Sequence, residues 1–562
     1  MSRARVLIAA AILAILVVAA AFRLPRLAQR PMHADEANQA CKSGRLYERG
    51  EYEYDATDHH GPSLYWLTLP SLAISGAKDL AGSGEFAYRI VPVLFGLGLI
   101  PLILLLVDGL GRAAVTAAAV LTAISPALVF YSRYYIQETL LVFFTLAAMG
   151  CGWRYLRTRR LAWILAAGAA VGMMHATKET WILSAAAAVA AAGLTWAWPR
   201  IGSLRLAPGD AAERAEPRQI PPKSCRGEGI SCSRIRLFLH VLAAVFVACL
   251  VAAAFFSMFG KNWEGPWKSI CAYANYFRRG SQQGEHSEPW YYYLHQLFAY
   301  RPYKRIFWSE GFIAVLALIG AVYSLVARDV GEEGRTTSTA ASSHALLRFL
   351  TFYTVILTLL YSLVSYKTPW CALSFLMGMI LLAGVGAAAI FRVLPNWPLK
   401  FVAAIVLAAG AGHLGWQAYQ LSFNPRFMAD TLNPYVYAHT PTPLPKLALR
   451  LDRLAERAPE GHDLFVQVVV TDNYWPLPWY LRKFSESRVG YWLDGQIWKQ
   501  NRGHYPPPAI LILSGDIDRD DLATFLAGYG GPLNGSLRPG VLIAVYVRKD
   551  LWPALLDCQA EN

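Results

Sequence analysis

The chain has 562 residues, of which 55% are hydrophobic and only 16% are charged. Soluble domains carry about 25% charged residues, so this composition excludes an ordinary soluble protein. The apolar residues stand in long blocks, which predicts a polytopic membrane protein. The formal net charge of +14 is better explained by basic cytoplasmic loops and contact with anionic lipid than by nucleic acid.

Apolar runs of about 20 residues, the length that crosses the hydrocarbon core of a bilayer, recur along the chain. The first run follows Arg3 and Arg5 and has no good small-residue cleavage site, so we expect an uncleaved helix rather than a signal peptide. We predict about eleven transmembrane helices, near residues 6–22, 86–107, 113–131, 136–153, 161–177, 180–198, 237–258, 307–327, 346–366, 371–391 and 401–421.

Basic residues in short loops indicate the orientation of the chain. Four arginines lie between the fourth and fifth predicted spans (Arg154, Arg157, Arg159 and Arg160), which predicts that this loop and the N-terminus are cytoplasmic. The loops 23–85 and 259–306 and the C-terminus are then extracytoplasmic. We therefore expect a multi-pass protein of the plasma (inner) membrane.

Two short segments and a C-terminal tail complete the predicted architecture. Residues 64–74 and 291–300 are too short to span a bilayer and rich in aromatic residues, so they predict helices along the membrane interface. Beyond a transmembrane domain of residues 1–421, the tail 422–562 has strand patterns at 463–470, 508–513 and 540–547 and a helical pattern at 518–529. This alternation predicts a small extracytoplasmic α/β domain.

Polar residues at the edges of the predicted spans fall almost entirely on the outer side. Ionisable groups at membrane depth are costly and usually face a cavity or mark a functional site, so their gathering predicts one site at the outer leaflet. We take Asp35 and Glu36 as the catalytic pair, since a carboxylate can deprotonate a sugar hydroxyl. The substrate-binding candidates are His33, Tyr54, His59, His60, Glu138, Lys178, Glu179, Arg278 and Lys367.

Simpler interpretations of the same residues are open. Asp35 and Glu36 also fit the first turn of a helix, where the helix dipole favours acids. Lys178 and Glu179 can neutralise each other, and Lys367 can be a snorkelling lysine at the end of a span. A phosphate leaving group needs cationic donors, and Lys367 is our first choice for that role. No set of residues has clear metal-ligand spacing, so we expect no cofactor, although a divalent metal is compatible with the site.

Seven motifs spread over most of the chain resemble the C-type (GT-C) superfamily of membrane glycosyltransferases, which includes protein O-mannosyltransferases and aminoarabinose transferases. The resemblance is closest to a flippase-activity-associated glycosyltransferase-like family of archaea and bacteria. The motifs are His33-x-Asp35-Glu36-Ala37, Tyr52-x-Tyr54-Asp55, His60-Gly61-Pro62-x-Leu64-Tyr65, Lys178-Glu179-Thr180, Tyr366-Lys367-Thr368-Pro369-Trp370, Asn433-Pro434-x-x-Tyr437-Ala438-x-Thr440 and Tyr474-Trp475-Pro476-Leu477-Pro478-Trp479-Tyr480.

The resemblance implies a polyprenyl-phosphate sugar donor, transfer with inversion, and an acid of the first outer loop as base, which is Asp35 by position. The acceptor implied is a glycan, a lipid or a protein. A second hypothesis is a non-catalytic protein that translocates lipid-linked glycans or assists a flippase. Such a carrier needs polar residues in the inner halves of its spans as well, and the sequence has few there. A third hypothesis is an assembly protein whose outer domain binds a partner.

Overall fold

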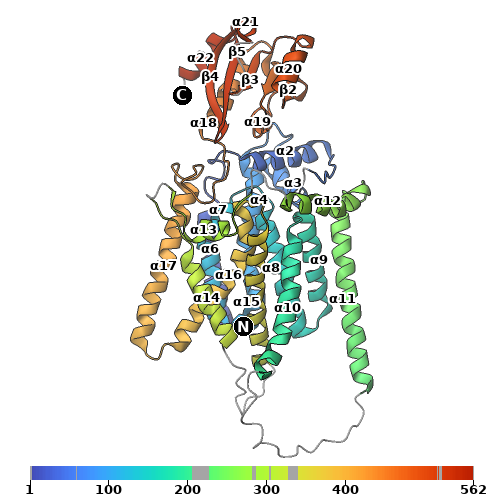
Figure 1. Ribbon diagram of the computed structural model, residues 1–562, viewed down its shortest axis with the longest axis vertical. Coiled ribbons are helices and arrows are strands. Elements are labelled where there is room, and N and C mark those ends of the chain that lie inside the picture. The colour runs from blue at the N-terminus through green and yellow to red at the C-terminus, as the bar shows by residue number, and fades with distance from the viewer. Residues whose placement is uncertain are drawn as a thin grey trace, which may run out of the picture.

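The computed structural model describes residues 3–57, 60–204, 227–281, 287–302, 306–326, 339–471, 473–515, 517 and 522–560. A bundle of long helices carries a C-terminal domain with a β-sheet at one end (Figure 1). This arrangement confirms the predicted combination of a helical membrane protein and a small sheet-containing domain.

Every predicted span coincides with a helix. Within the described residues, eight helices are long and apolar enough to cross a membrane: Val6–Arg23, Glu85–Leu110, Glu138–Thr158, Trp181–Pro199, Arg234–Phe256, His344–Leu363, Pro369–Val393 and Trp397–Phe423. The bent pair Arg112–Ile124 and Pro126–Ser132 makes up to nine, and two apolar helices, Leu161–Thr177 and Gly311–Val326, are shorter.

The helices of the bundle have the following bounds: α1 (Arg3–Arg23), α4 (Glu85–Leu102), α5 (Val107–Leu110), α6 (Arg112–Ile124), α7 (Pro126–Ser132), α8 (Glu138–Thr158), α9 (Leu161–Thr177), α10 (Trp181–Leu204), α11 (Gly227–Phe256), α14 (Gly311–Val326), α15 (Thr339–Leu363), α16 (Leu373–Val393) and α17 (Trp397–Phe423). The helices α6 and α7 meet at 57°. Pro126 has no N–H to continue the hydrogen-bond ladder, and the Ser125 side chain caps α7 instead.

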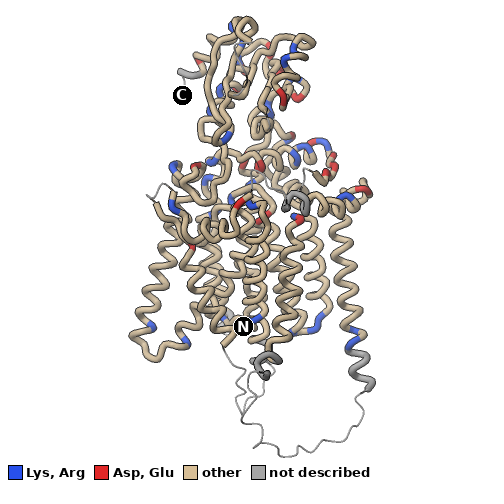
Figure 2. Tube along the Cα trace, viewed as in Figure 1, with Lys and Arg blue, Asp and Glu red and all other residues tan. Residues whose placement is uncertain are grey.

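Four shorter helices lie at the end of the bundle that carries the C-terminal domain (Figure 1): α2 (Ala34–Arg49), α3 (Ser63–Ser75), α12 (Glu264–Ser281) and α13 (Tyr292–Phe298). The two short helices predicted at 64–74 and 291–300 are thereby confirmed as α3 and α13. Figure 2 shows charged residues concentrated at this level, whereas the length of the bundle carries few. The segments 23–85 and 259–306 therefore meet at the same end of the bundle as the C-terminal domain.

The C-terminal sheet has the strand order β2-β1-β3-β5-β4. Its strands are β1 (Val466–Val469), β2 (Val489–Trp492), β3 (Ile510–Ser514), β4 (Tyr529–Arg538) and β5 (Val541–Arg548). The strands β1, β2 and β3 are parallel, and β5 is antiparallel to both β3 and β4. The three predicted strands correspond to β1, β3 and β5.

Alternate strand residues pack against different helices. One face, which includes Val466 and Val468, packs on α18 (Pro443–Arg457), α19 (Leu477–Tyr480) and α22 (Trp552–Ala560). The other face, which includes Val469 and Leu511, packs on α20 (Gly495–Asn501) and α21 (Ala523–Leu526). Within the described residues, these two short helices are the ones that cover the second face.

The helix predicted at 518–529 is only partly observed. Within the described part of that range, α21 spans Ala523–Leu526, and Tyr529 already begins strand β4. The strand β4 contains Gly530, Gly531 and Pro532, residue types that strands disfavour. Its pairing with β5, rather than its own sequence, makes this segment a strand.

Candidate active site

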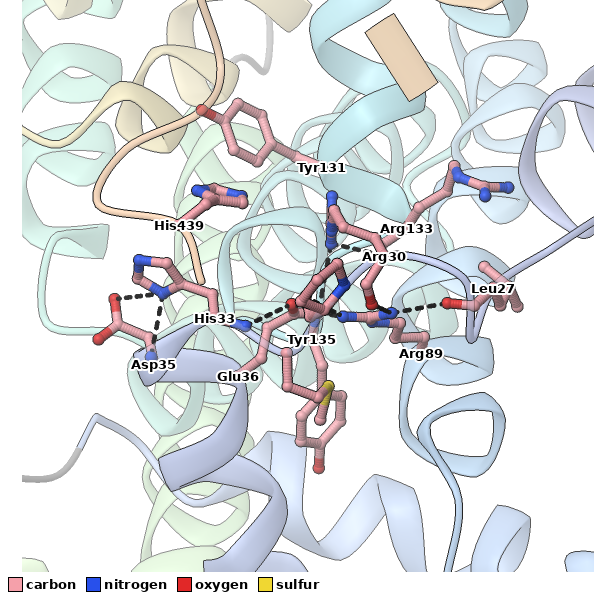
Figure 3. Close-up of polar contacts among 12 residues, drawn as sticks. Leu27, Arg30, His33, Asp35, Glu36, Arg89, Tyr131, Arg133, Tyr135 and His439 are labelled. Atoms are coloured by element: carbon pink, nitrogen blue, oxygen red, sulfur yellow. Dashed lines mark hydrogen bonds and ion pairs between the residues drawn. The ribbon is translucent and has the colours of Figure 1, made fainter. Parts of the chain in front are cut away.

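The first turn of α2 is fixed by its own side chains (Figure 3). His33 is the N-cap residue, and its Nδ1 accepts a hydrogen bond of 3.0 Å from the Asp35 N–H. The Glu36 carboxylate accepts the His33 N–H at 3.2 Å, which completes a capping box. Because Nδ1 is the acceptor, Nε2 carries the proton and donates to the Tyr437 carbonyl at 2.8 Å.

Glu36 is fully buried and fully engaged. Arg89 donates to both its oxygens, from Nε at 2.8 Å and from Nη2 at 2.7 Å. Arg30 Nη2 donates to the same carboxylate at 3.3 Å, and the Tyr135 N–H at 2.9 Å. Burial alone would raise the pKa of Glu36, but Arg89 and Arg30 lower it to about 2. Glu36 is therefore a permanent anion whose contacts hold α2 in place, an arrangement that does not favour its predicted part in catalysis.

Asp35 lies one residue earlier in a different environment. Its side chain is 50% exposed, and its Oδ2 lies 3.9 Å from Nδ1 of the His33 ring, which is neutral because Nδ1 accepts a hydrogen bond. Figure 3 shows its carboxylate on the side of α2 opposite the Glu36 arginines. Of the two predicted catalytic acids, Asp35 is the one with an accessible carboxylate.

Arginines hold the loop that leads into α2. Arg89 Nη1 donates to the carbonyls of Leu27 at 2.7 Å and Arg30 at 2.8 Å, and Nη2 to that of Pro31 at 3.1 Å. Arg133 Nη1 donates to the carbonyls of Arg23 and Pro25 at 2.8 and 2.7 Å. The five donors of each guanidinium allow one side chain to fix several turns of backbone.

Glu179 pairs with a residue far along the chain, His60, rather than with Lys178. His60 Nδ1 lies 3.0 Å from Glu179 Oε2, and Tyr54 Oη lies 3.5 Å from Oε1. Burial raises the pKa of Glu179 and His60 lowers it, with a net decrease. The structure thus brings three predicted site residues, Tyr54, His60 and Glu179, into one cluster at the end of α9.

Lys178 has its own partner, Glu138 at the start of α8. Both side chains are buried, with 5% and 2% exposure. The charges of these two neighbouring predicted residues are therefore neutralised within the bundle.

Lys367 is 1% exposed and has no carboxylate partner among the described residues. Its Nζ donates to the Glu288 carbonyl at 3.1 Å and to the Val364 carbonyl. Burial lowers the pKa of Lys367, and the charge of Glu288 opposes that shift. Carbonyl oxygens accept hydrogen bonds from an ammonium group without neutralising it, so Lys367 can attract an anionic ligand.

The segment that follows Lys367 extends from this lysine to the first turn of α2. The Trp370 ring lies 6.0 Å from the His33 ring, centroid to centroid. The segment after Lys367 therefore reaches the first turn of α2, which carries Asp35.

A strap of residues 433–440, between α17 and α18, covers the first turn of α2. No role was predicted for its side chains from the sequence. Tyr437 accepts from His33, and the Thr440 hydroxyl donates to the Met32 carbonyl at 2.7 Å. The His439 ring lies 4.9 Å from the His33 ring and 5.4 Å from that of Tyr134. The strap belongs to the motif from Asn433 to Thr440, which was its only signal in the sequence. The hydrogen bond between His33 and Tyr437 spans 404 residues, and such a distant contact leaves no periodic pattern in the sequence.

Two candidates cannot be located. His59 and the side chain of Arg278 lie outside the described residues. Their predicted roles stay predictions. Among the described residues, no three His, Cys, Asp or Glu side chains are grouped so that they could hold a metal ion.

Residues 13–210, about a third of the chain, match a family described as dolichyl-phosphate-mannose-protein mannosyltransferase. No curated protein matches the chain. Among solved structures, the chain is similar to ArnT from Cupriavidus metallidurans bound to undecaprenyl phosphate, with a TM-score of 0.58 and 14% identity over 96% of this chain and 97% of that one. It is also similar to the oligosaccharyltransferase AglB from Archaeoglobus fulgidus, in complex with an inhibitory peptide and a dolichol-phosphate. That match has a TM-score of 0.54 and 11% identity over 98% of this chain and 75% of that one.

These similarities, at such low identity, concern the fold. The family match shows a likeness over residues 13–210 alone. The predicted fold is confirmed: a bundle of long apolar helices with a small C-terminal sheet domain, similar to the fold of ArnT.

Proposed function

We propose that the protein transfers a sugar from a polyprenyl-phosphate donor to an acceptor at the extracytoplasmic face, with inversion and with Asp35 as the general base. One observation carries the proposal. The arginine contacts that fix α2 occupy the Glu36 carboxylate, whereas Asp35, on the same turn, keeps a half-exposed carboxylate that has no lysine or arginine partner among the described residues. The family match supports transfer from a lipid-phosphate sugar, and the two neighbours carry lipid phosphates.

The chemistry assigned to the residues is a single displacement. The Asp35 carboxylate removes a proton from the acceptor nucleophile, which attacks the anomeric carbon while the bond to the donor phosphate oxygen breaks. Lys367 contacts the departing phosphate and stabilises the charge that it gains. We assign Lys178 an indirect role, because Glu138 already neutralises it. His60, Tyr54 and Glu179 position the outer loop against α9.

The test is the Asp35→Asn variant assayed for sugar transfer from a polyprenyl-phosphate sugar, with the purified protein in nanodiscs. Loss of a general base reduces turnover by about 10²–10⁴-fold. Glu51→Gln is a matched control, since Glu51 is an exposed acid just beyond α2. Turnover at the wild-type level in Asp35→Asn, with the fold intact, would remove the base assignment.

The proposed orientation has its own test. A cysteine placed at Glu51 should react with a membrane-impermeant maleimide added outside intact cells, because we place the loop that contains Glu51 and the C-terminal domain outside. A cysteine at Arg160, in the loop between α8 and α9, should react only after permeabilisation. The reverse pattern would invert the topology.

A further inference from the structure

A cavity of about 250 Å³ lies in the C-terminal domain. It is on the face of the sheet that α20 and α21 cover, away from the face packed on α18 and α22. Its walls come from the segment before β1, from α20, from the 502–508 segment and from α21. Nothing in the assigned reaction uses this cavity.

Four of the ten residues that line the cavity are aromatic. Phe465 and Tyr505 stack at 6.4 Å between centroids, and Trp498 meets Phe525 edge-on at 6.2 Å. These contacts fix the rings in position before any ligand arrives. The electron-rich face of such a ring attracts the C–H groups on the apolar face of a sugar, so the wall fits a flat, partly apolar ring that also carries polar groups.

Two polar side chains reach the cavity from different elements. Arg502 is stacked over Phe525, with its guanidinium carbon 5.0 Å from the ring centroid, and its Nη1 is buried without a hydrogen-bond partner among the described residues. Gln467 accepts the Trp492 indole N–H through Oε1, which leaves its amide N–H groups to donate. A buried charged donor without a partner is unfavourable, and a carboxylate or phosphate would satisfy the planar fork of Arg502.

We propose that this cavity binds one anionic sugar unit, carrying a carboxylate or a phosphate, of an acceptor glycan. The inference rests on the proposed function for its biological setting. The donor is held at the membrane by its lipid, whereas this cavity lies in the C-terminal domain, at one end of the bundle (Figure 1). We therefore assign its occupant to the acceptor.

The test measures binding to the full-length protein in nanodiscs by calorimetry. The probes are a galacturonic acid oligomer, the matched neutral galactose oligomer and inorganic phosphate. We expect the acidic oligomer to bind at least about tenfold more tightly than either other probe, because only it offers both a sugar face and an anion. Equal binding of the neutral oligomer would overturn the assignment to Arg502, and equal binding of phosphate would overturn recognition of a sugar ring.

Variants locate the site. Arg502→Gln should weaken binding of the acidic oligomer about tenfold or more, and Tyr505→Ala should weaken binding of both oligomers. Arg488→Gln is the matched control, since Arg488 is an exposed arginine of the same domain. An unchanged affinity in both cavity variants would overturn the proposal. Displacement of the acidic oligomer by an acidic peptide of equal charge would also overturn it, because the cavity would then be a peptide site.

The outcome can be separated from that of the proposed function. Binding of the oligomer requires no transfer, so Asp35→Asn should bind it with wild-type affinity. Failure of the Asp35 test leaves the binding result intact, and failure to bind the oligomer leaves the transfer assay intact.

Discussion

Two neighbouring acids acquire opposite properties at the scale of single residues. Asp35 and Glu36 stand side by side in the first turn of α2, but successive residues of a helix point about 100° apart. Glu36 therefore points into the buried region where it pairs with arginines, and Asp35 stays half-exposed. Glu36 supports the first turn of α2, and Asp35 is the proposed base.

The Glu36 ion pair should make stability depend on pH in an acidic window. Its pKa is about 2 in the folded protein, below the ordinary value of 4.5. The resulting stabilisation, about 3 kcal/mol, is complete above pH 4.5 and is lost as the pH falls toward 2. Thermal unfolding of Glu36→Gln should therefore differ most from wild type near neutral pH, and the difference should shrink below pH 4.5. A difference that is constant from pH 7 to 3 would contradict this role.

Lys367 should act on the donor. Lys367→Gln removes a buried cation that no described carboxylate neutralises, so we expect the KM for the polyprenyl-phosphate sugar to rise about tenfold or more. Lys367→Arg should recover part of the loss. Lys261→Gln, at an exposed lysine in the loop before α12, should leave the KM unchanged. A fall in stability without any change in KM would assign Lys367 to the fold instead.

The positions of the helices were predictable from the sequence, but the side-chain pairs between them were not, as the residues around α9 illustrate. Apolar length alone located α9 and α10, and the polar residues at their junction marked a site. Lys178 and Glu179 looked able to neutralise each other, yet Lys178 pairs with Glu138 and Glu179 with His60. Contacts across 40 and 119 residues depend on how helices pack, which periodicity does not encode. The strand β4 was missed for the same reason, since its pairing with β5 overrides its glycines.

The junction of α3 and α9 depends on a close backbone approach. A Cβ at Gly61 would lie 2.3 Å from the Ala176 carbonyl oxygen, so the His60 loop can reach Glu179 only because Gly61 has no side chain. Ser63 Oγ and Thr177 Oγ1, 2.8 Å apart, fasten the same junction.

Gly61→Ala should therefore destabilise the protein by about 1–3 kcal/mol and reduce transfer. Gly412→Ala in α17 is the control, since nothing lies within 4 Å of its Cβ position. Unfolding temperatures and transfer rates of the two variants provide the comparison. Equal stability of both would mean that the loop does not need this close approach.

At the scale of the whole molecule, the C-terminal domain holds the segment that carries the proposed base. The backbone of Met32 is bonded on both sides: its N–H donates to Tyr480 Oη at 2.9 Å, and its carbonyl accepts from Thr440. Arg482 stacks 3.8 Å from the Trp479 ring and donates to the Ser83 carbonyl at 2.9 Å. The domain is thus fastened to the bundle directly beside Asp35, and this attachment explains why one fold combines the two parts.

The double variant Tyr480→Phe with Thr440→Val removes both bonds to Met32 and keeps nearly the same side-chain shapes. Each bond contributes about 0.5–1.5 kcal/mol, so the fold should survive while the 30–36 segment becomes more mobile. Hydrogen exchange of amides 30–36 should then accelerate and kcat should fall, with exchange in β1 and β3 unchanged. Tyr419→Phe, at an exposed tyrosine of α17, should change neither. Faster exchange with a normal kcat would show that the proposed base does not need this attachment, and the C-terminal domain would then serve acceptor binding alone.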